Sequence, residues 1–187
     1  ICTYSNFSGE NFFKKELLLI EKILSICEKN GRYLYVRPHP HFVGNEFDTL
    51  KMSSYLFIGK PVHKASYSCI FNPEDHIFKI RLLQKADLII NVGTTLVLEA
   101  SLLNKRIVQL SLNDKEFSGF SKACKNYHIS NYLLKDKDTI NINLENLKTL
   151  EKHILNEIKS KFAKQLKTSF FNDTELCHTV KSVVGYL

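Results

Sequence analysis

The segment Ala86–Leu110, ADLIINVGTTLVLEASLLNKRIVQL, decides the fold that we expect for this chain. Leu88–Val92 and Arg106–Leu110 are short apolar runs, and Thr94–Leu103 between them has the pattern of a helix. Short apolar runs on both sides of a helix are typical of parallel strands buried on both faces of a sheet. The segment therefore predicts a strand, a Gly-Thr-Thr turn, a helix and a second strand.

Strands and helices are expected to alternate along the rest of the chain as well. The other expected strands are residues 1–5, Arg32–Arg37, Tyr55–Ile58, Tyr67–Phe71 and Thr139–Ile142. The other expected helices are Glu10–Lys29, a helix that begins at Asn72–Asp75 and runs toward Ala86, Asn143–Leu166 and Asn172–Val184. The expected loops are His41–Lys51 and Ser111–Asn126. This alternation predicts an α/β fold of the Rossmann-like type, in which a doubly wound parallel sheet carries helices on both faces.

The length and composition predict one ordinary globular domain. The chain has 187 residues, of which 44% are hydrophobic and 24% are charged. It has no apolar run of about 18 residues and no visible signal peptide, so we expect a cytoplasmic location. The five cysteines are scattered and form no C-x-x-C, which favours buried free thiols over a metal or disulfide framework. Because the chain begins within a strand-like run and without Met, we expect a fragment that lacks an N-terminal domain.

The net charge of +7 suits an anionic partner, such as nucleic acid, an anionic membrane or a phosphorylated small molecule. The positive residues are mostly lysines spread along the chain, with no aromatic-interleaved basic motif, so nucleic acid is not expected. The lysine-rich helix Asn143–Leu166 could contact an anionic membrane. Its apolar residues favour packing on the domain instead: Leu147, Leu150, Ile154, Leu155, Ile158 and Phe162.

Ligands of a doubly wound sheet bind beyond the carboxyl ends of its strands. The segments that follow the expected strands are Ser5–Gly9, Arg37–His41, Phe71–Asp75, Gly93–Thr95 and Ser111–Lys115. Two of these segments have a composition that suits a phosphorylated ligand, and both follow apolar strands.

The first is the turn at Gly93. Glycine permits a tight turn and a close approach of a ligand to the backbone, and Thr94 or Thr95 can cap the helix that follows. The free N–H groups of a first helical turn favour an anion such as phosphate. Glu99 lies four residues after Thr95, so it does not fit a capping box, which needs an acid at the third position. Its carboxylate can accept from a hydroxyl-bearing ligand such as a ribose. Alternatively, it can pair with a nearby Lys or Arg or simply interact favourably with the helix dipole.

The second is Arg37-Pro38-His39-Pro40-His41, in which two prolines keep the chain extended after the strand. Arg37 can bind phosphate through two parallel hydrogen bonds, and His39 can donate to a phosphate oxygen or act as an acid or base. His39 and His41 point the same way on an extended chain, but no third ligand is evident, so a metal site is not favoured.

Together the two segments resemble the C-terminal nucleotide-sugar-binding domain of glycosyltransferases with the B-type fold. The resemblance is closest to the bacterial capsule polysaccharide, sialic-acid and glycerophosphate transferases. It rests on Arg37-Pro38-His39-Pro40 and on Ala86-Asp87, Gly93-Thr94-Thr95 and Glu99-Ala100, and it covers roughly residues 1–112. The second residue of this turn is usually Ser in these families, so Thr at 94 and 95 is a mild departure from their pattern.

The resemblance implies the donor-binding part of a glycosyltransferase that uses a CMP-, CDP- or UDP-activated donor and a glycan or lipid-linked acceptor, with no cofactor. It implies that His39, Thr94 and Thr95 bind phosphate and that Glu99 binds ribose, with Arg37 as a further contact. The usual catalytic base lies in an N-terminal domain, which leaves His39 as a possible catalytic residue here. Two other functions remain open from the residues: a sugar-nucleotide epimerase or hydrolase of similar fold, and a non-catalytic binding domain.

Overall fold

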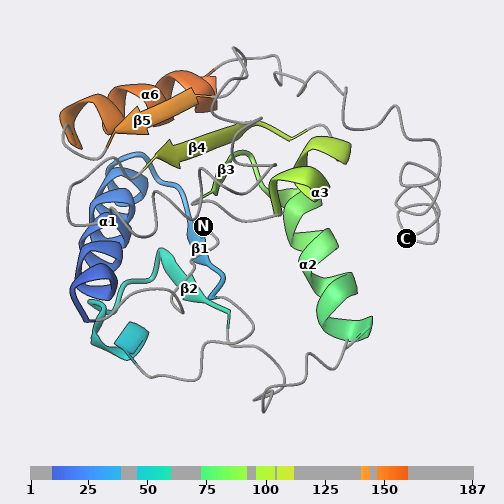
Figure 1. The fold of residues 1–187 in the computed structure, drawn as a ribbon, viewed down its shortest axis with the longest axis horizontal. Coiled ribbons are helices and arrows are strands. Elements are labelled where there is room, and N and C mark those ends of the chain that lie inside the picture. Colours follow the sequence, from blue (N-terminus) through green and yellow to red (C-terminus); the bar gives the residue numbers. More distant parts are fainter. Residues whose placement is uncertain are drawn as a thin grey trace.

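The computed structural model describes residues 10–38, 46–59, 73–91, 96–103, 105–111, 140–143 and 147–159. They form a mixed α/β structure (Figure 1). The elements in chain order are α1 (Glu10–Lys29), β1 (Leu34–Val36), a 3-10 helix (Glu46–Thr49), β2 (Leu56–Ile58), α2 (Pro73–Lys85), β3 (Ile89–Asn91), α3 (Leu96–Leu102), β4 (Ile107–Ser111), β5 (Ile140–Asn143) and α6 (Leu147–Lys159). The expected strands at residues 1–5 and Tyr67–Phe71 and the expected helix Asn172–Val184 lie outside the described residues.

All strand pairings in the described part of the chain are parallel, as the sequence predicts. Strand β1 pairs with β2, with Leu34 opposite Leu56 and Val36 opposite Ile58. Strands β3, β4 and β5 form a second sheet in that order. Parallel neighbours need crossover connections, and α3 provides the one between β3 and β4.

Alternate residues of β3 and β4 face two different cores. Ile90 and Val108 belong to a first core, built mainly from α1 and completed by α6. Ile89 and Ile107 pack in a second core with residues of α2 and α3. Since successive residues of a strand point to opposite faces of the sheet, helices cover both faces of β3 and β4. This explains why both runs are apolar throughout and do not alternate. The final residue of β3, Asn91, is fully buried although it is polar.

Strand β1 presents its residues to the same two sides. Leu34 and Val36 lie in the first core with α1, whereas Tyr35 points the other way and approaches Phe78 of α2, with ring centroids 6.2 Å apart. The carboxyl end of β1 is thereby brought next to the first turns of α2.

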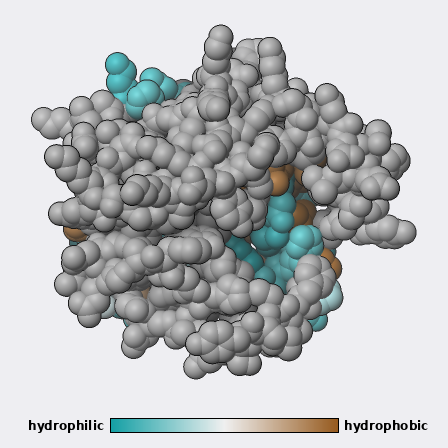
Figure 2. All heavy atoms as spheres, in the orientation of Figure 1, coloured by the Kyte–Doolittle hydropathy of each residue, from teal (hydrophilic) through white to brown (hydrophobic). Residues whose placement is uncertain are grey.

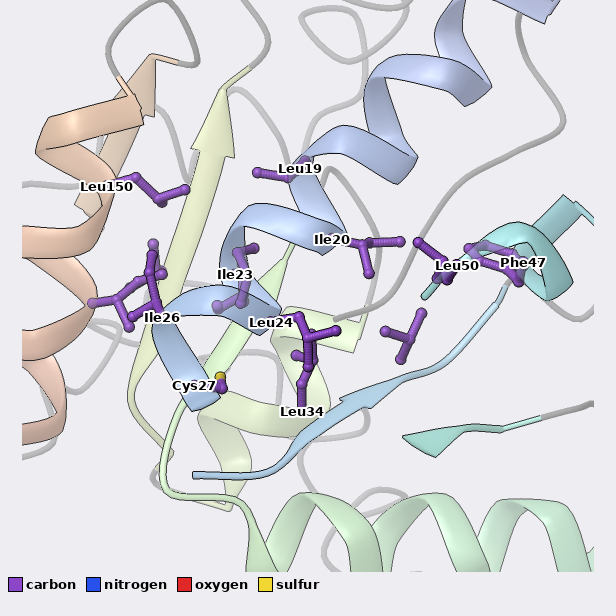
Figure 3. Packing of buried hydrophobic residues seen from close by; sticks show 14 residues of the cluster. Leu19, Ile20, Ile23, Leu24, Ile26, Cys27, Leu34, Phe47, Leu50 and Leu150 are labelled. Atoms are coloured by element: carbon purple, nitrogen blue, oxygen red, sulfur yellow. The ribbon is translucent and has the colours of Figure 1, made fainter. Parts of the chain in front are cut away.

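The first core is the larger and lies between α1, β1 and α6 (Figure 3). Helix α1 supplies most of it, and Ile20 and Ile23 have no exposed surface. Leu150 and Ile154 of α6 are also fully buried against it. The prediction that the apolar face of this helix packs on the domain is thus confirmed for these two residues. No helix in the described part of the chain is long and apolar enough to span a membrane.

Helix α1 has the predicted bounds, and its C-terminus shows why. Gly31 adopts a left-handed conformation with φ of 61°. Its N–H donates to the carbonyl of Glu28 (3.2 Å), and the N–H of Arg32 donates to the carbonyl of Cys27 (2.9 Å). These two bonds are the Schellman arrangement, which satisfies carbonyls at the end of a helix.

Replacing Gly31 by Ala is expected to lower the free energy of unfolding by about 1–2 kcal/mol, because an L-residue is strained in this conformation. A Cβ at Gly31 would meet no atom within 4 Å, so the cost is one of backbone strain alone. Gly31→Asn should cost less, because Asn tolerates the left-handed region. Urea unfolding of both variants measures the difference; equal losses would contradict the strain explanation.

Several strand ends differ from the expected ones by one or two residues, and two predictions are wrong by more than that. The segment His41–Lys51 was expected to be loop, but Glu46–Thr49 forms a 3-10 helix. This segment forms a 3-10 helix because Phe47 and Leu50 are buried in the first core. The helix Asn143–Leu166 was expected to begin at Asn143, but that residue ends β5, where it pairs with Ser111, and α6 begins at Leu147.

Candidate functional site

Arg37 lies directly after β1, at the strand end that the sequence predicts to face a ligand. Its Nη2 donates to Oδ2 of Asp75 on the first turn of α2, at 2.6 Å. The two side chains are only 13% and 23% exposed, so the ion pair is largely shielded from solvent. Such pairs are screened far less than surface pairs. Arg37 therefore joins the carboxyl end of β1 to the N-terminal half of α2.

Glu99 lies on α3, the helix that follows β3. Its Oε1 accepts a hydrogen bond from Nζ of Lys79 at 2.6 Å, and the side chains are 29% and 17% exposed, respectively. Lys79 follows Asp75 by four residues, which puts both on one face of α2. Among the alternatives for Glu99, pairing with a nearby cation is observed, and that cation is Lys79.

These two ion pairs and His76 form one group, which we call the polar cluster: Arg37, Asp75, His76, Lys79 and Glu99. Burial is the largest cause that lowers the pKa of His76, and Lys79 lowers it further. Glu99 and Asp75 act in the opposite direction, and Arg37 adds to the lowering. All four other members of the polar cluster thus act on the pKa of His76, and the net effect favours its neutral form.

One oxygen of the polar cluster is unused. Oε2 of Glu99 is buried and accepts no hydrogen bond in the structure. A buried carboxylate oxygen without a donor is costly. The ion pair with Lys79 therefore leaves acceptor capacity that a hydroxyl group could fill.

Tyr35 of β1 lies near the polar cluster, and its ring packs against Gly59, the residue that follows β2. A Cβ on Gly59 would overlap the Tyr35 hydroxyl and lie 2.7 Å from Cζ, so only glycine leaves room for this ring. Burial is the main cause that raises the pKa of Tyr35; Arg37 lowers it and Asp75 raises it. In Figure 2, hydrophilic residues with apolar ones beside them are visible on the side where Figure 1 draws α2.

The structure brings together Arg37 and Glu99, which the sequence analysis selected from two separate segments. The other predicted site residues, His39, Pro40, Gly93, Thr94 and Thr95, lie outside the described residues, as does His41.

Sequence reasoning missed His76 and Lys79, and it named Asp75 only as a helix-starting acid at a strand end. The available signal was their spacing. An Asp, a His and a Lys at positions i, i+1 and i+4 of a helix place a carboxylate, a titratable ring and a cation within about one turn. That helix starts beside a predicted ligand-binding edge.

In the ranges that the structure describes, no group of three or more His, Cys, Asp and Glu side chains could hold a metal ion. Cys27 is a buried free thiol, as expected, and burial is the main cause that raises its pKa.

Comparisons of this chain with family models, curated proteins and solved structures give no match.

Proposed function

We propose that this chain is the donor-nucleotide-binding part of a glycosyltransferase, with the Rossmann-like, doubly wound sheet of one half of a B-type fold. The donor would be a CMP-, CDP- or UDP-activated sugar or glycerophosphate-like group. The acceptor would be a glycan or lipid-linked surface polymer such as a capsule polysaccharide. The observation that carries the proposal is that Arg37, after β1, and Glu99, after β3, belong to one largely shielded polar cluster.

The chemistry of the polar cluster suits a nucleotide because it offers both kinds of contact that a nucleotide requires. Arg37 and Lys79 are cations of the type that bind phosphate oxygens. Oε2 of Glu99 is a buried acceptor of the type that binds a ribose hydroxyl. The two groups lie on elements that follow different parallel strands, where ligands of open α/β sheets bind.

In this proposal, Glu99 binds the ribose, and Arg37, His39 and the Gly93-Thr94-Thr95 turn bind the phosphates. Cationic side chains and free N–H groups can neutralise a diphosphate leaving group without a metal ion. His39 remains the possible catalytic residue. In the family that the sequence resembles, the base that activates the acceptor comes from an N-terminal domain.

Nucleotide binding is tested by thermal unfolding of the full chain with CMP, CDP and UDP at millimolar concentration. A nucleotide present at 100 times its Kd stabilises by about 2.7 kcal/mol. For a chain of this size, that raises the Tm by roughly 5–10 °C. If none of the three nucleotides raises the Tm, the proposal is wrong.

The role of Glu99 is tested by comparing CDP with 2′-deoxy-CDP. If Oε2 of Glu99 accepts from the 2′-hydroxyl, wild type should bind CDP about tenfold or more tightly, the value of a hydrogen bond to a charged group. Glu99→Gln should lose this preference, and Glu21→Gln on the exposed face of α1 should keep it. Calorimetric titration measures both affinities. Equal binding of the two nucleotides by wild type would remove Glu99 from the ribose site.

A further inference from the structure

His76 lies on α2 between Asp75 and Lys79, the two residues through which that helix makes both ion pairs of the polar cluster. It follows Asp75 directly and precedes Lys79 by three residues on α2, so all three lie within about one turn. Arg37 reaches this turn from the end of β1, and Glu99 reaches it from α3. The charged groups that act on His76 from its own helix and from the elements beside it are therefore two cations and two carboxylates.

These four charges cancel without His76. Arg37 is matched by Asp75 and Lys79 by Glu99, in two short ion pairs. A phosphate group that binds Arg37 or Lys79 adds negative charge to a cluster that already contains one carboxylate for each cation. An uncompensated charge in a partly buried site is costly, because desolvation is not offset by a partner. A phosphate can therefore enter most favourably if the site also gains a positive charge.

We propose that His76 is a ligand-binding residue of this site, and that it accepts a proton from solvent when a phosphate-bearing ligand enters the polar cluster. This inference rests on the proposed function and goes beyond it, because it makes nucleotide binding dependent on pH through one named side chain. At most one proton is taken up by His76 for each ligand bound. The imidazolium then donates hydrogen bonds from both ring nitrogens.

The state of His76 before binding supports this direction. Burial and the neighbouring Lys79 hold its pKa below the usual value, which favours the neutral ring before a ligand binds. A bound phosphate would add a negative charge beside the ring and raise that pKa, because a nearby opposite charge favours the protonated form. Since the complex binds more protons than the free protein, affinity falls as the pH rises through this range. If one proton is taken up, the Kd rises at most about tenfold for each unit of pH.

The test is isothermal titration calorimetry of the full chain with CDP at pH 7.5, in buffers whose ionisation enthalpies differ. The dependence of the observed enthalpy on the buffer gives the number of protons taken up. We expect wild type to take up between half and one proton more than His76→Gln. His153 on α6 is exposed and serves as the matched control. His153→Gln should take up as many protons as wild type. Because CDP contributes equally to all three titrations, the difference between proteins belongs to the side chain.

The outcomes separate the two proposals. If CDP binds wild type and His76→Gln with equal proton uptake, His76 is not the proton acceptor, while the proposed nucleotide site stands. If CDP does not bind wild type, the same titrations are made with CMP and UDP, and failure of all three nucleotides overturns both proposals. A second measurement needs no variant: the NMR titration of the His76 ring in wild type, with and without saturating CDP. Its midpoint should move to higher pH in the complex; an unchanged midpoint would overturn the inference.

Discussion

Ile23→Ala is expected to lower the free energy of unfolding by about 2–5 kcal/mol, the usual cost of truncating a large buried aliphatic side chain. Ile23 has no exposed surface and belongs to the first core, to which α1, β1, β3, β4 and α6 all contribute. Truncation loses the transfer free energy of the removed groups. It also leaves a cavity that the elements around it cannot all move to fill.

The matched control for Ile23→Ala is Leu18→Ala on the same helix. Leu18 is 62% exposed, so its truncation loses little buried area and leaves no cavity. Its effect should stay within about 0.5 kcal/mol. Urea unfolding of the two variants measures the contrast. A loss at Leu18 as large as that at Ile23 would mean that this face of α1 is covered in solution.

Asp75→Asn is expected to lower the free energy of unfolding by about 1–3 kcal/mol. This lies between the values for exposed and for buried ion pairs. The change removes the charge that balances Arg37 in a pair whose side chains are only 13% and 23% exposed. It also removes a negative charge from the first turn of α2. Because it releases the Arg37 guanidinium for a phosphate, the same variant should bind CDP more tightly than wild type.

The chain contains its own control for this prediction. Arg32 and Asp87 form a second Arg–Asp ion pair at 3.1 Å, with side chains that are 49% and 69% exposed. Asp87→Asn should cost about 0.5 kcal/mol or less, because solvent screens an exposed pair. Chemical denaturation of the two variants under the same salt conditions compares the pairs directly. Equal losses would show that burial does not determine the strength of the Arg37–Asp75 pair.

The parts of the fold that depend on local patterns could be predicted from the sequence. Helix α1 has the expected bounds because its apolar periodicity and Gly31 are local signals that agree. The 3-10 helix at Glu46–Thr49 could not be predicted, because it owes its form to the burial of Phe47 in a core built by distant elements. Asn143 likewise adopts strand geometry because β4 pairs with it, and no nearby residue indicates this.

The candidate site shows the same division. Arg37 and Glu99 could be selected because each is a charged residue that follows an apolar run. The connection of Arg37 and Glu99 through Asp75 and Lys79 could not be predicted, because it depends on where α2 lies relative to the strands. His76 was missed for a related reason. Its significance comes from four charges on three elements, and only two of them, Asp75 and Lys79, are near it in the sequence.

Asn91 has a consequence for the accuracy of folding. A slip of one residue between β3 and β4 would exchange Ile89 with Ile90, but both faces of the sheet are apolar and covered by helices. The slipped and native pairings would then bury nearly the same hydrocarbon. Asn91 separates them, because a fully buried amide needs hydrogen-bond partners, and a slip of one residue would turn its side chain to the other, apolar face of the sheet. One polar residue at the end of β3 thus selects the native alignment from a competitor that hydrophobic burial cannot distinguish.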